Sequence, residues 1–200
     1  MSLEVPEQTF ITPTDLLKRY QRFDPNIWTR WQRAGKVVKL RNGLYLNKNY
    51  QIRGDLDRFV IANQMYSPSY ISLHSALRYY NLIPEAVFEV TSISTRKTKA
   101  FDNNYTLYSF RKLQPSYFFG YKVEPWRGNY YAIAYLEKAI LDMMYLDAAF
   151  SDSDYLLEMR FNQEVLIEEI SWDRMNLYLK LYDSGVVSSR VELLKKVYGL

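Results

Sequence analysis

A short basic segment near the N-terminus carries the residues best suited to chemistry with a polyanion. In KVVKLRNGLYL, residues 36–46, Asn42-Gly43 separates two runs of β-prone residues. This pattern predicts a β-hairpin with a two-residue type I′ turn, because that turn needs φ > 0 at both central residues. Cations on an exposed hairpin can contact nucleic-acid phosphates. We therefore expect phosphate contacts from Lys36, Lys39, Arg41 and Asn42, with Arg41 and Asn42 at the hairpin tip.

Two short helices are predicted before this hairpin. The first begins with Thr12 as its N-cap, Pro13 at its first position and Asp15 in its first turn. The second spans about residues 25–34 and ends at Gly35. Two helices followed by a hairpin are the order of a winged helix-turn-helix, whose second helix enters the major groove of DNA. The exposed face of that helix would read bases through Asn26, Thr29, Arg30 and Arg33.

Charge is unevenly distributed along the chain, although the formal net charge is only +4. Residues 12–48 carry a net charge of +7, whereas residues 137–192 carry −7. This asymmetry indicates a basic end for a polyanion and an acidic end with another role. The predicted helices of residues 154–200 carry apolar stripes. They could dock a basic protein or a second copy of the chain, or they could close the core of the body.

A second basic cluster lies between two predicted strands, in STRKTKAF. A polar loop, a second DNA contact and a surface for an acidic partner are all compatible with this cluster. The pair Arg111-Lys112 would join it only if the fold brings the strands together. The residues of this second basic surface are Arg96, Lys97 and Lys99.

Residues typical of enzymes do not form a recognisable catalytic set. His74 is the only histidine, and the chain has no cysteine. The aspartates of SDSDY, residues 151–155, lack an upstream Gly-Ser loop, so we interpret Ser153 or Asp154 as a helix N-cap. No glycine-rich nucleotide motif is present. We expect no enzymatic activity, no metal and no cofactor. A final interpretation is that the charged residues of one predicted helix lie on its surface, namely Glu137, Lys138 and Asp142.

The whole pattern predicts an α+β protein. We expect a winged helix-turn-helix in residues 1–50 and a mixed α+β body domain in residues 51–200 that ends in helices. No apolar run approaches about 20 residues, and the N-terminus lacks a secretory pattern, so a cytoplasmic protein without membrane contact is expected. The body is predicted to contain helices from Asp55 and Leu73, four strands, and helices from Leu136 onward. The strands are predicted at residues 87–94, 105–113, 118–126 and 130–135.

Several stretches together resemble the AbiEi family of antitoxins and transcriptional regulators from bacterial abortive-infection systems of type IV. They occur in family order between residues 12 and 147 and read KVVKLRNGLYL, YISLHSALRYYNLIPE, EVTSISTRKTKAF, YSFRKL, FFGY and AYLEKAILDMMYL. The resemblance implies a reading helix at residues 25–34, a wing at residues 36–45 and a C-terminal antitoxin domain. Family members carry a further helix before the one at Thr12. Only about ten residues with Pro6 precede it here, so we expect this helix to be shortened, completed by the body domain or replaced by a short strand.

The resemblance also implies a function. We expect a DNA-binding autorepressor whose partners are double-stranded DNA of its own promoter and the cognate toxin or the targets of that toxin. The toxin would be a nucleotidyltransferase-like protein encoded next to it, and the antitoxin could act as a homodimer. The alternative is a protein-interaction module whose winged helix docks a protein instead of reading DNA.

Overall fold

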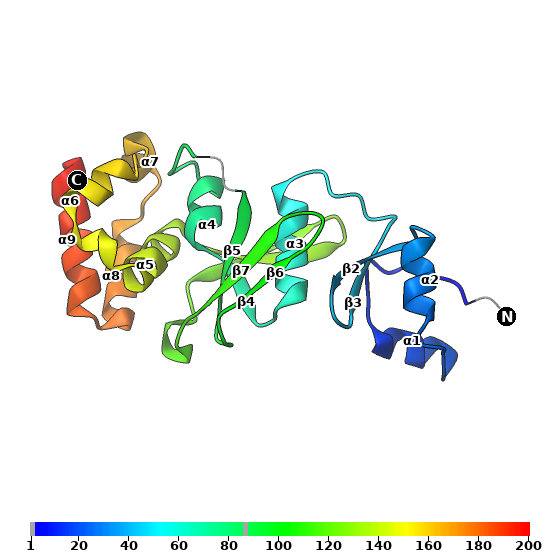
Figure 1. Cartoon of the computed structure of the whole chain (residues 1–200). Helices are drawn as coiled ribbons and strands as arrows, with labels where there is room; N and C mark the ends of the chain where they lie inside the picture. Colours follow the sequence, from blue (N-terminus) through cyan, green and yellow to red (C-terminus); the bar gives the residue numbers. More distant parts are fainter. Residues whose placement is uncertain (1–2, 86–87) are drawn as a thin grey trace.

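A computed structural model describes residues 3–85 and 88–200 and has a mixed α+β fold. Within these ranges the strands form one sheet of three strands and one of six. Figure 1 shows an elongated molecule, with the N-terminal helices at one end, the larger sheet in the middle and the C-terminal helices at the other end. The predicted α+β class is therefore confirmed.

The N-terminal unit, residues 3–48, combines two helices with a small antiparallel sheet. Helix α1 (Pro13–Tyr20) begins as predicted, because Thr12 and Asp15 form a reciprocal capping box. Helix α2 (Ile27–Arg33) is shorter than predicted and is followed by Gly35, whose φ is +65°. The strands are β1 (Phe10–Ile11), β2 (Val37–Arg41) and β3 (Leu44–Asn47), in the order β1-β3-β2.

Of the alternatives for the segment before α1, the structure has the short strand and not a shortened helix. Residues 3–9 contain no helix, and the two residues that follow form β1. Strand β1 pairs with β3, with Phe10 opposite Leu46 and Ile11 opposite Tyr45. A short strand therefore completes the small sheet, in place of the helix that the family resemblance implies.

The β2–β3 hairpin is present, but its turn is not of type I′. Asn42-Gly43 connects the strands, and only Gly43 has a positive φ, +74°. A type I′ turn would require a positive φ at Asn42 as well. The pairing of β2 with β3 shifts between Lys39 and Arg41, which marks a bulge. The bulge adds twist to the strand, so the hairpin does not need a type I′ turn.

The body begins with helix α3 (Asp55–Met65) and helix α4 (Leu73–Tyr79), close to their predicted positions. The four predicted strand regions correspond to β5, β7, β8 and β9. Strand β4 was not predicted, and β6 occupies a stretch that we interpreted as a loop. Strand order in the mixed sheet is β6-β7-β5-β4-β9-β8. The strands are β4 (Ser69–Ile71), β5 (Glu89–Ser94), β6 (Lys99–Asp102), β7 (Leu107–Lys112), β8 (Tyr121–Trp126) and β9 (Asn129–Ala134).

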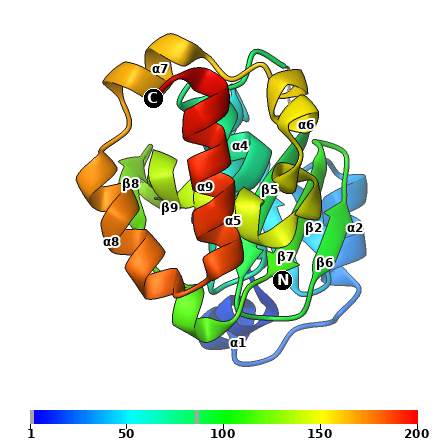
Figure 2. The ribbon, with the colours of Figure 1, turned by 90° about the vertical axis from the view of Figure 1, so that its left-hand side faces the viewer.

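The C-terminal part is helical, and Figure 2 looks onto it, with α9 crossing in front of α5. Asp152, and not Ser153 or Asp154, is the N-cap of α6, because its side chain accepts a hydrogen bond of 2.9 Å from the Asp154 N–H. No helix in the described ranges is long and apolar enough to cross a membrane. The helices are α5 (Leu136–Leu146), α6 (Ser153–Glu158), α7 (Gln163–Glu168), α8 (Trp172–Tyr182) and α9 (Gly185–Tyr198), with 3-10 turns η1 (Pro115–Tyr117) and η2 (Ala148–Ser151).

Two clusters of buried apolar side chains meet at the β2–β3 hairpin. In the smaller cluster the Trp28 ring of α2 stacks on Tyr45 of β3, with 3.9 Å between ring centroids. The larger cluster fills the body and includes Leu44 and Leu46 of the same strand. Successive residues of β3 therefore face different clusters, as strand geometry requires, and this packing fixes the hairpin from both sides.

Three charged residues of α5 are buried, which corrects the surface interpretation. The side chains of Glu137, Lys138 and Asp142 are all 0% exposed. Lys138 and Asp142 form the predicted i,i+4 ion pair, but they do so inside the core. Asp142 also accepts hydrogen bonds from the hydroxyls of Tyr182 at 2.6 Å and Ser72 at 2.7 Å. A charged i,i+4 pair is typical of a helix surface, so its burial could not be recognised from the sequence.

Candidate nucleic-acid interface

A groove separates the β2–β3 hairpin from the edge strand β6 of the body, and its cavity volume is about 990 Å³. In Figure 1 the hairpin lies beside α3, and strand β6 overlaps α3 in this view. We call this cavity the basic groove. It joins two basic segments that are far apart in the sequence. The N-terminal unit contributes Gln32, Lys39, Arg41, Asn42 and Lys48, and the body contributes Arg96, Lys99, Phe101, Asn103 and Asn104.

The basic groove has a positive lining. Its charged residues are five cations and the single acid Asp102, which leaves a formal charge of +4. None of the five cations forms an ion pair with a carboxylate in the ranges that the structure describes. The lining therefore keeps its charge available for an anionic partner. The five cations are Lys39, Arg41, Lys48, Arg96 and Lys99.

Uncharged contacts hold two of these cations in place. Arg41 donates from Nε to the Met65 carbonyl at 2.6 Å. Arg96 donates to the Ser67 carbonyl at 3.2 Å, and its guanidinium lies 4.5 Å from the centroid of the Tyr66 ring. A carbonyl oxygen and an aromatic ring orient a guanidinium without neutralising it. The groove is therefore preorganised for anion contact on both of its sides.

The residues predicted to read bases lie on α2 or at its start, and all four are exposed. They do not line the basic groove; α2 contributes Gln32 to it instead. Arg30 pairs with Asp24 at 3.4 Å, and both side chains are more than half exposed. The other three are Asn26, Thr29 and Arg33, so the predicted interface divides into an exposed helix face and a separate groove.

Two of the three residues of the second basic surface lie beside the hairpin. Arg96 and Lys99 line the basic groove, whereas Lys97, like Lys36 of the N-terminal unit, is exposed outside its lining. The backbone N–H of Lys112 donates to the Thr98 hydroxyl at 3.0 Å, which places the end of β7 beside the same turn. The sequence could not establish this arrangement, because it depends on the pairing of β6 with β7.

Some groove residues were missed by the sequence reasoning. Lys48 was counted only in the net charge of residues 12–48, and Asn103 and Asn104 were not among the predicted site residues. In β6, Lys99 and Phe101 lie opposite Phe110 and Tyr108, so these two residues share one face of the sheet. Lys99-Ala100-Phe101-Asp102 lacks a strict polar–apolar alternation, so the sequence carried no clear strand signal for this face.

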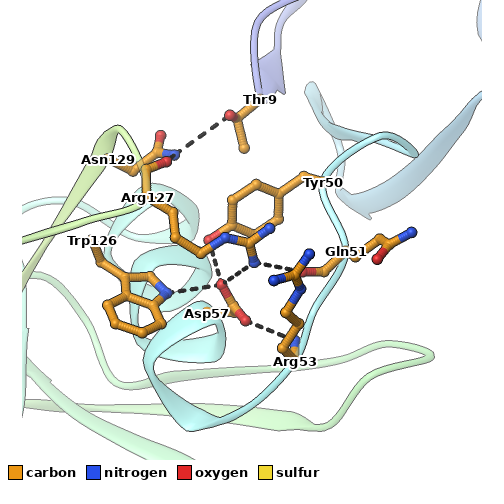
Figure 3. Close-up of polar contacts among 8 residues, drawn as sticks. All are labelled: Thr9, Tyr50, Gln51, Arg53, Asp57, Trp126, Arg127 and Asn129. Atoms are coloured by element: carbon orange, nitrogen blue, oxygen red, sulfur yellow. Dashed lines mark hydrogen bonds and ion pairs between the residues drawn. The ribbon is translucent and has the colours of Figure 1, made fainter.

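A buried carboxylate, that of Asp57, links the end of the N-terminal unit to the body, and Figure 3 shows its contacts. Asp57 of α3 is 1% exposed and pairs with Arg127 at 2.9 Å. It also accepts hydrogen bonds from the Tyr50 hydroxyl at 2.7 Å, the Arg53 N–H at 2.7 Å and the Trp126 indole at 2.9 Å. Tyr50 and Arg53 belong to the connection after β3, whereas Trp126 ends β8 and Arg127 lies in the β8–β9 turn. Asp57 therefore fixes the connection between the N-terminal unit and the sheet.

This carboxylate predicts an acid-sensitive part of stability. Burial raises the pKa of Asp57, but its four hydrogen-bond donors outweigh burial and lower the pKa to about 2 from the ordinary 3.8. Because the folded pKa is the lower one, the stabilisation is present above about pH 4 and is lost as the pH falls to about 2; it amounts to about 2 kcal/mol. Urea titrations between these pH values should show this loss in the wild type but not in Asp57→Asn. An equal pH dependence in both proteins would contradict the assignment.

The residues considered for catalysis do not assemble into a site. His74 is exposed on α4, and the Asp152 side chain is used as the cap of α6. Among the residues that the structure describes, no group of three histidine, aspartate or glutamate side chains could hold a metal ion.

Comparison with known proteins does not identify a family. No family model matches the chain. A search of curated proteins also gives no match. The likeness to the AbiEi family therefore stays a prediction from sequence motifs, and the functional argument depends on the groove and on the exposed face of α2.

Proposed function

We propose that this protein binds double-stranded DNA through a winged helix-turn-helix formed by α1, α2 and the β2–β3 hairpin, together with the basic groove. The observation that supports this best is the lining of the groove. Its formal charge is +4, and it lacks ion pairs among the described residues. Unpaired cations on a surface gain free energy when phosphates replace their counterions.

In this proposal the two parts of the interface have different tasks. The groove cations Lys39, Arg41 and Arg96 contact phosphates and orient the protein, which requires no particular base sequence. The exposed face of α2 reads base edges in the major groove. Arg30 would exchange its partner Asp24 for a base at little cost, because an exposed ion pair contributes less than about 1 kcal/mol. The remaining base-reading residues are Asn26, Thr29 and Arg33.

The biological role that we propose follows from the AbiEi-like motifs. The protein would repress its own operon by covering the promoter, and the body in residues 51–200 would act as an antitoxin. Its opponent would be a nucleotidyltransferase-like toxin encoded next to it. We propose that the protein acts in the cytoplasm, because it would find both of its partners there. These partners are the promoter and the toxin or the targets of that toxin.

A second function is favoured by one observation. Helix α2 has only seven residues, and apolar side chains such as Met65, Tyr66 and Phe101 line the groove beside its cations. This mixture also suits an acidic protein segment with apolar anchors. In that case the winged helix would dock a protein, and DNA would bind only as a nonspecific polyanion.

Charge-neutral variants on the two sides of the groove test the proposal. Lys39→Gln and Arg96→Gln should each weaken binding to duplex DNA and reduce the dependence of log K on log salt by about 1, because each removes about one phosphate contact. Lys180→Gln on α8 is the matched control, since it removes an exposed cation at the acidic end. Fluorescence polarisation at several salt concentrations measures both quantities. Equal slopes in all four proteins would overturn the role of the groove.

A further inference from the structure

A second cavity lies in the body, apart from the basic groove. It is bounded by the first turns of α3, the C-terminal half of α4, the start of β5 and the β6–β7 turn, and its volume is about 580 Å³. This volume is in the range of sites for small molecules and cofactors. The proposed DNA binding does not use this cavity, so its lining needs a separate explanation.

One buried polar atom at the cavity lacks a partner in the described residues. The Nε atom of Arg58 is buried without a hydrogen-bond partner, although its Nη1 atom donates to Asp55 at 2.7 Å. Arg78, exposed on α4, lines the cavity and forms no ion pair within the described ranges.

The remaining walls combine aromatic rings with two acids, Asp55, which is paired with Arg58, and Glu89. Phe59 and Tyr79 pack with their ring centroids 6.3 Å apart, and Tyr105 lines the cavity from the β6–β7 turn. Glu89 at the start of β5 also lines it, and its carboxylate has no ion pair among the residues described. A buried donor without a partner, such as Arg58 Nε, destabilises the protein, and a bound acceptor would remove this cost. The lining therefore offers cationic donors, an acceptor and aromatic surface within one cavity.

We infer that this cavity binds a nucleoside monophosphate. Two guanidinium groups match the geometry and charge of a phosphate, so Arg58 and Arg78 would hold that group. A carboxylate is a common partner of ribose hydroxyls, which is the role of Glu89. Aromatic side chains stack on the π face of any base, so Tyr79 and Tyr105 would hold the base of the nucleotide. A simple aromatic acid would use the arginines and the rings but would leave Glu89 without a function.

The position of the cavity connects it to the basic groove. Residues 103–106 form the β6–β7 turn, in which Asn103 and Asn104 line the basic groove, while Tyr105 and Thr106 line the second cavity. A nucleotide held against Tyr105 would therefore fix the turn that also shapes the groove. This regulatory consequence rests on the proposed DNA binding, whereas the binding of the nucleotide does not.

Isothermal titration calorimetry of the full chain with AMP, GMP, CMP and UMP tests the inference. At least one of them should bind with a Kd below about 1 mM, and Arg78→Gln should weaken this binding by at least about tenfold. Arg78 is exposed, so its variant should keep the fold, which circular dichroism verifies. Tyr79→Leu is a second variant with the same expected direction. Arg111→Gln, an exposed arginine outside the cavity lining, should bind as the wild type does.

Three results would overturn the inference. They are the absence of saturable binding for all four nucleotides, unchanged affinity in both Arg78→Gln and Tyr79→Leu, and equal affinity for ribose 5-phosphate. The last result would indicate a phosphate site without base recognition. A protein that binds a nucleotide but no DNA would refute the proposed function and leave this inference intact, and the reverse result would do the opposite.

Discussion

Replacing Asp142 with asparagine is expected to lower the free energy of unfolding by about 3–5 kcal/mol, because Lys138 would remain buried without a counter-charge. Both side chains are 0% exposed, and the Lys138 ammonium also donates to the hydroxyls of Tyr70 at 2.9 Å and Tyr182 at 2.8 Å. Burial lowers the pKa of Lys138, and Asp142 opposes that effect. Urea unfolding followed by circular dichroism measures the loss.

A double-mutant cycle separates the ion pair from general damage to the core. Lys138→Met should also destabilise the protein, but the double variant Lys138→Met with Asp142→Leu should lose less than the sum of the single losses. The expected coupling is about 2 kcal/mol. Glu192→Gln is the control, because Glu192 is 67% exposed in its pair with Lys195 and should contribute less than about 0.5 kcal/mol. Additive losses in the cycle would contradict the account of a coupled buried pair.

Replacing Asp57 with asparagine should lower the free energy of unfolding by about 3 kcal/mol and weaken DNA binding as well. The stability loss follows from leaving Arg127 and three further donors around a neutral amide that cannot accept from all of them. The DNA effect follows from geometry, since Asp57 fixes the connection between the two sides of the basic groove. Chemical denaturation and fluorescence polarisation measure these two effects.

Asp55 provides the matched control for this variant on the same helical turn. Its carboxylate is 71% exposed, so Asp55→Asn should change stability by less than about 0.5 kcal/mol. A folded Asp57→Asn protein that binds DNA as tightly as the wild type would show that this cluster stabilises the fold without positioning the groove.

Local signals account for the parts of the fold that the sequence predicted. The Thr12 cap, the helix end at Gly35 and the hairpin at Asn42-Gly43 each depend on residues within a few positions of one another. The type of the turn was predicted wrongly, because the bulge between Lys39 and Arg41 depends on how both clusters pack on the hairpin. Strand β4 has only three residues, too few for an alternating pattern to be recognised.

The candidate site was predicted only as separate segments. Basic residues in the hairpin and near Arg96 were identified, but their convergence depends on the pairing of β6 with β7 and on the Asp57 cluster. Buried charges such as Lys138 are equally hidden from sequence reasoning, since an i,i+4 pair looks the same on a surface and in a core. Properties that require distant segments to meet are therefore the ones that the structure adds.

The central claim, sequence-specific DNA binding, is tested most directly by polarisation titration of the protein against a duplex from upstream of its own gene and a scrambled duplex of the same composition. At about 200 mM salt the upstream duplex should bind at least about a hundredfold more tightly, and Arg30→Ala should reduce this ratio. Equal affinity for both duplexes, lost together as salt rises, would contradict the claim. That result would indicate that the basic groove acts only as an electrostatic surface.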